Sequence, residues 1–256
     1  MTTSAFMAIA HRGASSYAPE NTLAAFDLAV RMGARDIELD VEATRDGHVV
    51  VIHDDTVDRT TDGSGPVTGH TLEGLRALDA GSWFGGEFAG ERIPLFDEVL
   101  RRYKGRVHLH TEIKGRSTYL SQRTADLVRR HGMVDQVTIT SFQKARLEEI
   151  RGYAPELTAG WLLAEVNDAA IAQARNLGLR QICPRATTVT AELVSRLHAE
   201  GFVVRAWGVD TEALMRQVVQ AGADGMTVNF PDKLIAYLSS SRGREGTSRP
   251  GEPPGT

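Results

Sequence analysis

Residues 36–54 read DIELDVEATRDGHVVVIHD. The first part of this stretch alternates acidic and apolar side chains, so Glu38 and Asp40 share one face of a strand. An Arg-Asp-Gly triplet at residues 45–47 is typical of a tight turn. It predicts that residues 49–53 form a second strand, paired with the first as a hairpin. The stretch is therefore expected to be a β-hairpin that carries two carboxylates on one face.

Outside the hairpin, strand-like and helix-like segments alternate along the chain. The predicted strands span residues 6–10, 36–41, 49–53, 107–111, 137–140, 157–161, 181–183, 202–207 and 225–228. The predicted helices span residues 21–32, 95–103, 119–130, 144–151, 168–177, 191–200, 212–220 and 233–238. Repeated strand–helix units indicate a parallel sheet with helices outside, and about 250 residues is typical of a closed barrel. We therefore predict an α/β fold, a (β/α)8 TIM barrel, in which the hairpin supplies the strand in excess of eight. An open doubly wound sheet is the alternative, although no Gly-rich phosphate loop follows the first strand.

The composition is that of a globular protein without a basic surplus. The 256 residues are 41% hydrophobic and 24% charged, with a formal net charge of −4. Lys and Arg are scattered rather than clustered, which argues against nucleic acid as a partner. Cys183 is the only cysteine, so no internal disulfide can form.

The first residues are not expected to form a signal peptide. Residues 1–9 lack a basic region and a long apolar run, and no stretch is apolar for long enough to span a bilayer. We therefore expect a cytoplasmic protein that acts on a small molecule, with its oligomeric state left open. One barrel domain is predicted over residues 1–238. Residues 239–256 are rich in Ser, Arg, Gly, Glu and Pro and are predicted to be a disordered tail.

Three acidic residues are candidates to bind a metal ion. In a barrel of this class the site lies at the C-terminal ends of the strands, and Glu38 and Asp40 would point into that mouth. Glu112 follows the strand at residues 107–111 and could supply a third oxygen ligand. His110 lies one layer deeper and is expected to be a core histidine. Two inward carboxylates repel each other unless a cation or a proton lies between them. The alternative is that Glu38 and Asp40 pair with arginines in a structural network.

Two histidines and two cations complete the candidate site. His11 and His53 each end an apolar strand, so one could protonate a leaving oxygen while the other removes a proton from the attacking group. Arg12 and Lys114 are candidates to bind a phosphate, although Arg12 could instead form an ion pair with Asp36 or Glu38, and Lys114 could be solvated at the strand end. Trp207 could wall the substrate pocket or pack at the barrel rim. Together these residues predict metal-assisted cleavage of a phosphate ester.

The roles of two polar residues and of one long connection are left open by the sequence. Asn21 stands where a helix starts and could be a simple cap. Asp54 could orient a histidine, bind the metal or form a turn. Residues 54–93 are irregular, and so long a connection inside a compact domain is often functional.

An ordered set of short motifs runs from about residue 6 to residue 238. The motifs are His11-Arg12-Gly13, Glu20-Asn21-Thr22, Gly33-Ala34, Glu38-Leu39-Asp40-Val41, Asp46-Gly47, His53-Asp54, Arg59-Thr60-Thr61, Gly65, Arg92-Ile93-Pro94, Glu98-Val99-Leu100, Glu112-Ile113-Lys114, Ser141-Phe142, Trp207 and Gly222-Ala223-Asp224-Gly225. Each motif is weak by itself, but the ordered set resembles the glycerophosphodiester phosphodiesterase family. The resemblance implies a phospholipase C-like phosphodiesterase barrel that cleaves glycerophosphodiesters into glycerol 3-phosphate and an alcohol.

The resemblance also implies a cofactor. It would be a divalent metal ion, Mg²⁺ or Ca²⁺ with Mn²⁺ as a further candidate, held at the positions matching Glu38, Asp40 and Glu112. The positions matching His11 and His53 would have acid–base roles.

Arg12 and Lys114 match the positions that would hold the phosphate.

Two departures from the family pattern concern the barrel rim. This chain has Trp-Gly-Val-Asp at residues 207–210 where members often have Trp-Thr-Val-Asn, and Asn229 where an acidic residue is common.

Two other functions remain open. The protein could be a lysophospholipase D or act on another phosphodiester, and Trp83, Phe84 and Phe88 are candidates for an apolar surface beside the mouth. It could also be a catalytically silent barrel that only binds. The complete set of candidate histidines and carboxylates argues against the silent barrel.

Overall fold

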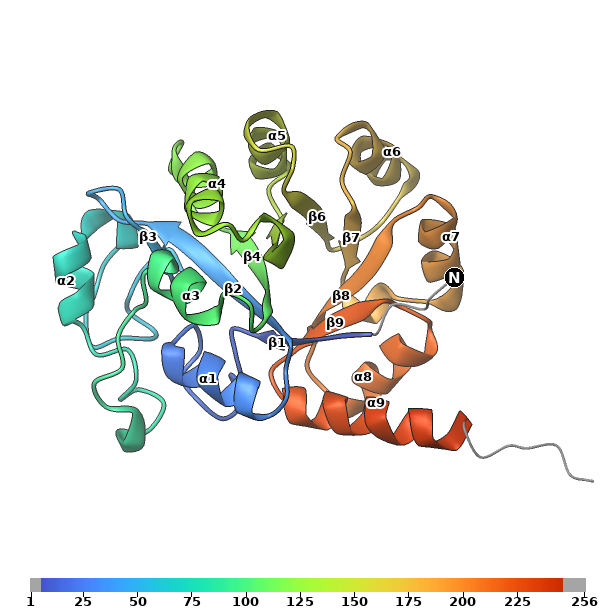
Figure 1. Ribbon diagram of the computed structural model, residues 1–256, viewed down its shortest axis with the longest axis horizontal. Coiled ribbons are helices and arrows are strands. Elements are labelled where there is room, and N and C mark those ends of the chain that lie inside the picture. The colour runs from blue at the N-terminus through green and yellow to red at the C-terminus, as the bar shows by residue number, and fades with distance from the viewer. Residues whose placement is uncertain (1–5, 246–256) are drawn as a thin grey trace, which may run out of the picture.

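The computed structural model describes residues 6–245, and its centre is a closed barrel of parallel strands (Figure 1). The barrel strands are β1 (Met7–His11), β2 (Asp36–Ala43), β4 (His108–Ile113), β5 (Val137–Ser141), β6 (Thr158–Leu163), β7 (Gln181–Pro184), β8 (Val203–Val209) and β9 (Gly225–Val228). β1 pairs in parallel with β9 on one side and with β2 on the other, so the sheet closes on itself. The predicted (β/α)8 barrel is confirmed, and the open sheet is excluded.

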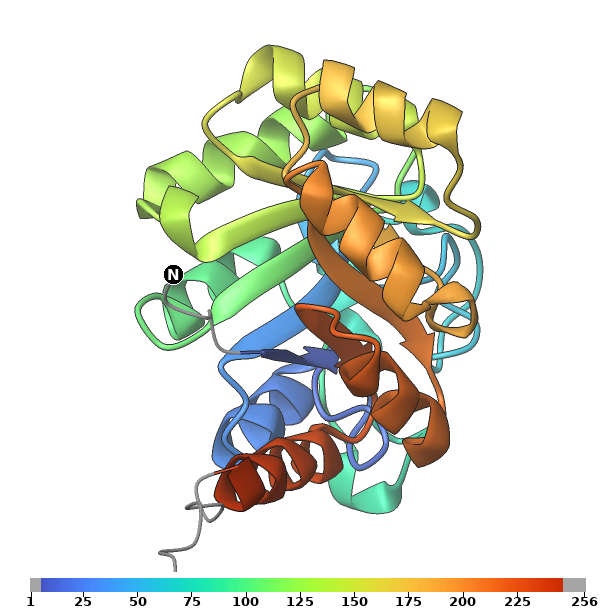
Figure 2. The same cartoon turned by 90° about the vertical axis from the view of Figure 1, so that its right-hand side faces the viewer.

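Helices surround the barrel (Figures 1 and 2). They are α1 (Leu23–Arg31), α3 (Phe96–Tyr103), α4 (Leu120–His131), α5 (Lys144–Tyr153), α6 (Asp168–Asn176), α7 (Ala191–Ala199), α8 (Glu212–Gln220) and α9 (Pro231–Glu245). Several begin after a side-chain cap: Thr22 accepts a hydrogen bond from the backbone N–H of Ala25, and Thr190 accepts one from Leu193. Apolar helix residues such as Phe26 and Leu147 are fully buried in the main core. Capping and apolar periodicity thus account for the helical layer.

The ninth strand lies outside the closed barrel. β3 (Val49–Val51) pairs antiparallel with the end of β2. Gly47 occupies the turn with a φ of 83°, a backbone conformation that glycine adopts at little cost. The hairpin predicted from the Asp46-Gly47 turn is therefore confirmed as the source of the extra strand.

The connection between β3 and α3 has a small core of its own. It contains η1 (Val67–Gly69), α2 (Leu72–Ala77) and η2 (Gly86–Phe88). The buried apolar residues of this second cluster are Val50, Ile52, Val57, Val67, Leu75, Ala80 and Ile93. The connection is therefore a packed unit, and part of it borders a cavity beside the barrel mouth.

The C-terminal helix extends beyond the predicted end of the barrel domain. α9 runs to Glu245, whereas a disordered tail was expected from Ser239. The prediction of disorder is wrong for residues 239–245, because the helix begun at Pro231 continues despite the polar composition. Residues 246–256 lie outside the described part of the chain. None of the helices within residues 6–245 is long and apolar enough to cross a membrane.

Candidate active site

Three carboxylates meet at the mouth of the barrel. Glu38 and Asp40 lie on β2 and Glu112 on β4, and the parallel register places Asp40 beside Glu112. Each offers one oxygen, and these oxygens all lie within 4.8 Å of one another. Strand alternation explains the placement, because residues two apart on a strand share a face. The structure therefore brings together all three predicted metal ligands.

The three carboxylates repel one another in a setting that excludes water. Burial raises the pKa of Glu38 well above its usual range, and the charges of Asp40 and Glu112 raise it further. Burial, followed by the charge of Asp40, raises the pKa of Glu112 to about 7. Oδ1 of Asp40 is buried without a hydrogen-bond partner among the described residues. Clustered oxygen donors of this kind are what a hard divalent cation binds, so the residues present fit a metal ion.

Two residues with positive φ hold the carboxylates in place. The backbone N–H of Arg12 donates to Oε2 of Glu38 at 3.1 Å, and the Nδ2 amide of Asn21 donates to Oδ2 of Asp40 at 2.9 Å. Arg12 and Asn21 have φ values of 54° and 57°, a backbone conformation that residues other than glycine rarely adopt. The interpretation of Asn21 as a helix cap is wrong, because Thr22 caps α1 and Asn21 supports Asp40 instead.

His11 is the last residue of β1 and lies near the carboxylate of Glu38. Its Nδ1 lies 2.6 Å from Oδ1 of Asn229, an oxygen that only accepts, so Nδ1 carries the hydrogen. Its Nε2 lies 3.9 Å from Oε2 of Glu38. Burial and the nearby charge of Arg12 lower the pKa of His11 to about 4, so the ring is neutral at neutral pH.

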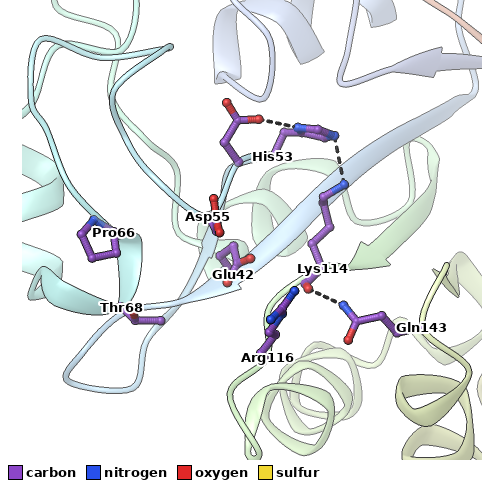
Figure 3. A pocket seen from close by; sticks show the side chains of 9 residues that line it. Glu42, His53, Asp55, Pro66, Thr68, Lys114, Arg116 and Gln143 are labelled. Atoms are coloured by element: carbon purple, nitrogen blue, oxygen red, sulfur yellow. Dashed lines mark hydrogen bonds and ion pairs between the residues drawn. The ribbon is translucent and has the colours of Figure 1, made fainter.

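His53 follows β3 and lies between an acid and a lysine (Figure 3). Its Nδ1 lies 2.6 Å from Oδ1 of Asp54, and its Nε2 lies 3.0 Å from Nζ of Lys114. An ammonium only donates, so Nε2 accepts from Lys114 and Nδ1 donates to Asp54. Of the roles left open for Asp54, the structure favours the orientation of a histidine. Arg59 in turn binds Asp54 through its Nε at 2.7 Å.

The two predicted phosphate-binding cations border the same mouth. The guanidinium of Arg12 contacts Glu20 at 2.8 Å and Asp40 at 3.4 Å. Nζ of Lys114 lies 3.5 Å from Oε1 of Glu112. The guanidinium of Arg12 therefore pairs with Glu20 and Asp40 rather than with Asp36 or Glu38, and both cations lie beside the acidic cluster.

A cavity of about 230 Å³ occupies the mouth, and both histidines and both cations line it. One wall is apolar and contains Phe142, Leu162 and Trp207. The rings of Phe142 and Trp207 meet edge to face with centroids 4.8 Å apart, and the indole N–H donates to the carbonyl of Leu163. Trp207 thus both packs at the rim and walls the cavity.

The remaining predictions near the mouth have mixed outcomes. His110 is fully buried and its Nε2 contacts Asp36 at 3.1 Å, as expected of a core histidine. Trp83, Phe84 and Phe88 pack on one another and do not line the mouth cavity. The apolar surface beside the mouth is instead formed by Phe142 and its neighbours.

The sequence interpretation missed Arg205, a cation inside the barrel. Its side chain lines the mouth cavity, yet the residue is 1% exposed. Its three guanidinium nitrogens have no hydrogen-bond acceptor among the described residues. Its charge opposes the burial and the neighbouring carboxylates that raise the pKa of Glu38. The available signal was its position two residues before Trp207, on the same face of β8.

The chain is similar to known proteins over nearly its whole length. The sequence model of the glycerophosphoryl diester phosphodiesterase family matches residues 11–233. A glycerophosphodiester phosphodiesterase of Caldanaerobacter subterraneus subsp. tengcongensis is 38% identical over 237 residues, covering 90% of this chain and 96% of that protein.

Solved structures agree with the sequence comparison. An Oleispira antarctica phosphodiesterase in complex with the product sn-glycerol-3-phosphate has a TM-score of 0.86 and 30% identity, over 90% of this chain and 96% of that one. A glycerophosphodiester phosphodiesterase from Agrobacterium tumefaciens has a TM-score of 0.80 and 31% identity, over 89% of this chain and 98% of that one. By its sequence and its fold, this chain belongs to the glycerophosphoryl diester phosphodiesterase family of enzymes.

Proposed function

We propose that this protein hydrolyses glycerophosphodiesters to sn-glycerol 3-phosphate and an alcohol, with a divalent metal ion as cofactor. The observation that carries the proposal is one cavity in which Glu38 and Glu112 face two imidazoles and a lysine. The related Oleispira antarctica structure contains sn-glycerol-3-phosphate, which supports the same product here.

Glu38, Asp40 and Glu112 would hold the metal ion, with Mg²⁺ or Ca²⁺ as the first candidates and Mn²⁺ as a further one. A bound divalent ion supplies positive charge that offsets the charge developing on the phosphate oxygens. Lys114 and Arg12 add positive charge beside the same position. The substrate phosphate would therefore lie beside the carboxylate cluster, within reach of Lys114 and Arg12.

The two histidines would move the protons. Each ring has its Nδ1 hydrogen held by an acceptor, Asn229 for His11 and Asp54 for His53. The Nε2 atoms, one beside Glu38 and the other beside Lys114, are then the atoms available for exchange in the mouth. One Nε2 would take a proton from the attacking hydroxyl. The other would first take up a proton, from solvent or, for His53, from the Lys114 ammonium, and would then deliver it to the departing alkoxide. The attacker is water or the glycerol hydroxyl, and a cyclic phosphate product would identify the second route.

The apolar wall would bind the carbon atoms of the substrate. Trp207 and Leu162 line the same cavity as the charged residues, so the glycerol carbons could contact them while the phosphate faces the cations. A small, mixed cavity of this kind fits a small-molecule partner. The cytoplasmic location and the limits of the domain stay predictions.

The test of the activity is release of sn-glycerol 3-phosphate from glycerophosphocholine and glycerophosphoethanolamine. The protein is first treated with chelator and then supplied with Mg²⁺, Ca²⁺ or Mn²⁺. We expect no release with chelator and restored release with at least one ion. Folded protein that releases nothing with any ion would contradict the proposal.

The roles of the histidines are tested by His11→Ala and His53→Ala. We expect each to lower kcat by about 10²–10⁴-fold, the range for loss of a positioned acid or base. His48→Ala is the control, because that side chain is half-exposed at the hairpin turn and does not line the mouth cavity. Turnover near the wild-type rate in either active-site variant would refute the two-histidine scheme.

A lysophospholipid is the second candidate substrate. Phe142 is 41% exposed and continues the apolar wall of the cavity outward, where an acyl chain could lie. Comparing rates on micellar lysophospholipid and on soluble glycerophosphodiester distinguishes the two substrates.

A further inference from the structure

We propose that a second cavity beside the barrel mouth binds the alcohol half of the substrate, and that Glu42 selects alcohols carrying a primary ammonium group. This inference rests on the proposed function. The cavity has a volume of about 530 Å³ and shares His53 and Lys114 with the mouth cavity. A phosphate held beside Lys114 can therefore extend its glycerol toward the apolar wall and its other substituent into this second cavity.

Glu42 is the buried acid of the second cavity (Figure 3). It lies on β2 two residues after Asp40, so strand alternation directs it to the same side of the strand as the metal-binding candidates. It is 4% exposed. Among the described residues, no side chain hydrogen-bonds to its carboxylate and no cation lies within ion-pair distance. Burial raises the pKa of Glu42 to about 7, and the charges of Asp55 and Asp40 add to this; the backbone of Ala43 and the charge of Lys114 oppose it without balancing it.

The structure around Glu42 keeps the carboxylate close to the backbone after β4. A Cβ atom added to Gly115 would lie 2.3 Å from Oε2 of Glu42, so glycine is what permits this close approach. A buried carboxylate without a cation is unfavourable, and a ligand cation that reached it would offset that cost. A positively charged hydrogen-bond donor that entered the second cavity would therefore be stabilised by the carboxylate of Glu42.

Three other charged residues that line the cavity affect where a ligand cation would bind. Asp55 lies at the exposed rim, and its charge adds to the negative potential around Glu42. Asp54 is already bound by Arg59 and His53. Arg116 also lines the cavity but is exposed, so water screens its charge more than that of the buried acid.

The walls favour a primary over a quaternary ammonium. Pro66 and Thr68 line one side, and no Phe, Tyr or Trp side chain is among the described residues that line the cavity. Quaternary ammonium groups are typically bound by aromatic faces, whereas a primary ammonium donates hydrogen bonds to carboxylates. An aminoethanol-type alcohol therefore fits Glu42 better than choline or an uncharged polyol.

The test compares kcat/KM for glycerophosphoethanolamine with kcat/KM for glycerophosphoglycerol, whose leaving alcohol is uncharged. We expect Glu42→Gln to lower the ratio of these two values about tenfold, because it removes a charge-assisted hydrogen bond. Glu73→Gln, an exposed acid on α2, is the matched control and should leave the ratio unchanged. An unchanged ratio in Glu42→Gln overturns the inference.

A second measurement uses only the wild-type protein. Ethanolamine should inhibit as a product about tenfold more strongly than glycerol or choline, since it alone combines small size with a primary ammonium. Equal inhibition by the three alcohols would contradict the assignment of this cavity. A wild-type protein that cleaves neither diester with any metal would instead refute the proposed function itself.

Discussion

At the scale of single residues, the orientation of His11 depends on one amide. Asn229 lies just after β9, far along the chain from β1, and its Oδ1 accepts the Nδ1 hydrogen of His11. Asp54 makes the equivalent contact with His53. The departure from the family pattern at position 229 therefore replaces a carboxylate by an amide while keeping an acceptor for the imidazole.

Asn229→Ala should lower kcat by about 10–100-fold, as expected when the partner that fixes an imidazole tautomer is removed. Asn229→Asp should retain much of the activity, because a carboxylate accepts the same hydrogen bond. Steady-state kinetics on both variants, with thermal melts to confirm folding, are the measurement. Equal losses in both variants would mean that Asn229 acts through packing alone.

At the scale of elements, the turn between β1 and α1 depends on a glycine. Gly13 has a φ of 84°, and a Cβ atom there would lie 2.7 Å from the backbone carbon of Ala25 in α1. Gly33, after α1, has a similar φ of 92° but nothing within 4 Å of the added atom. A substitution at Gly33 would therefore cost only backbone strain, whereas one at Gly13 would cost backbone strain and steric overlap.

Gly13→Ala should lower the free energy of unfolding by about 2–4 kcal/mol. This loss is the sum of the strain of alanine at a positive φ and the steric overlap of its Cβ atom with α1. Gly33→Ala should lower it by about 1 kcal/mol, from the backbone conformation alone. Urea denaturation of both variants measures the difference. Equal losses would show that α1 moves away from position 13 without cost.

The loops after β1 and β3 are joined by one acid. Glu20 contacts Arg12 and Arg59 at 2.8 Å each, and its side chain is 13% exposed. Burial by itself would raise the pKa of Glu20, but the hydrogen bonds and charges of Arg59 and Arg12 lower it from 4.5 to about 2. A carboxyl with a lowered pKa stabilises the folded state above its unfolded pKa, and that stabilisation is lost as the pH falls toward 2.

Glu20→Gln should therefore destabilise the protein by about 1–3 kcal/mol at pH 7, with a smaller difference from wild type at pH 3.5. Urea denaturation at the two pH values measures the effect. A difference that does not change with pH would assign the loss to packing rather than to charge.

At the scale of the whole molecule, the carboxylate cluster couples metal binding to stability. Without a cation, Glu38, Asp40 and Glu112 repel one another in a buried site. A ligand that binds only the folded state stabilises it, so an ion at about a hundred times its Kd should raise Tm by roughly 5–10 °C.

Glu112→Gln removes one of the repelling charges and one of the proposed ligands. In chelator its Tm should equal or exceed that of wild type, while the rise with Mg²⁺ or Ca²⁺ should largely disappear. Differential scanning calorimetry with and without the ion gives both values. An undiminished rise in the variant would place the ion elsewhere.

Much of the fold and part of the site follow from local geometry. The alternation of residues 36–41 and the spacing of Glu112 predict three carboxylates on one side of two strands, and the structure brings them together. Apolar periodicity predicts the helices, although the helix expected from residue 21 begins at Leu23 and the one expected to end at residue 238 reaches Glu245. Element ends depend on caps and tertiary contacts, which a periodic pattern does not specify.

The barrel, its hairpin and the grouping of acids at one end of the strands can all be inferred from the order of residues along the chain. These features depend on spacings of two and about 3.6 residues along one element. Three features are visible only in three dimensions: Asn229 orients His11, Asn21 supports Asp40, and Arg205 is buried without an acceptor in the described part of the chain. These features depend on residues that are far apart in the sequence. They exist only once the barrel has closed and fixed the position of each strand against the next.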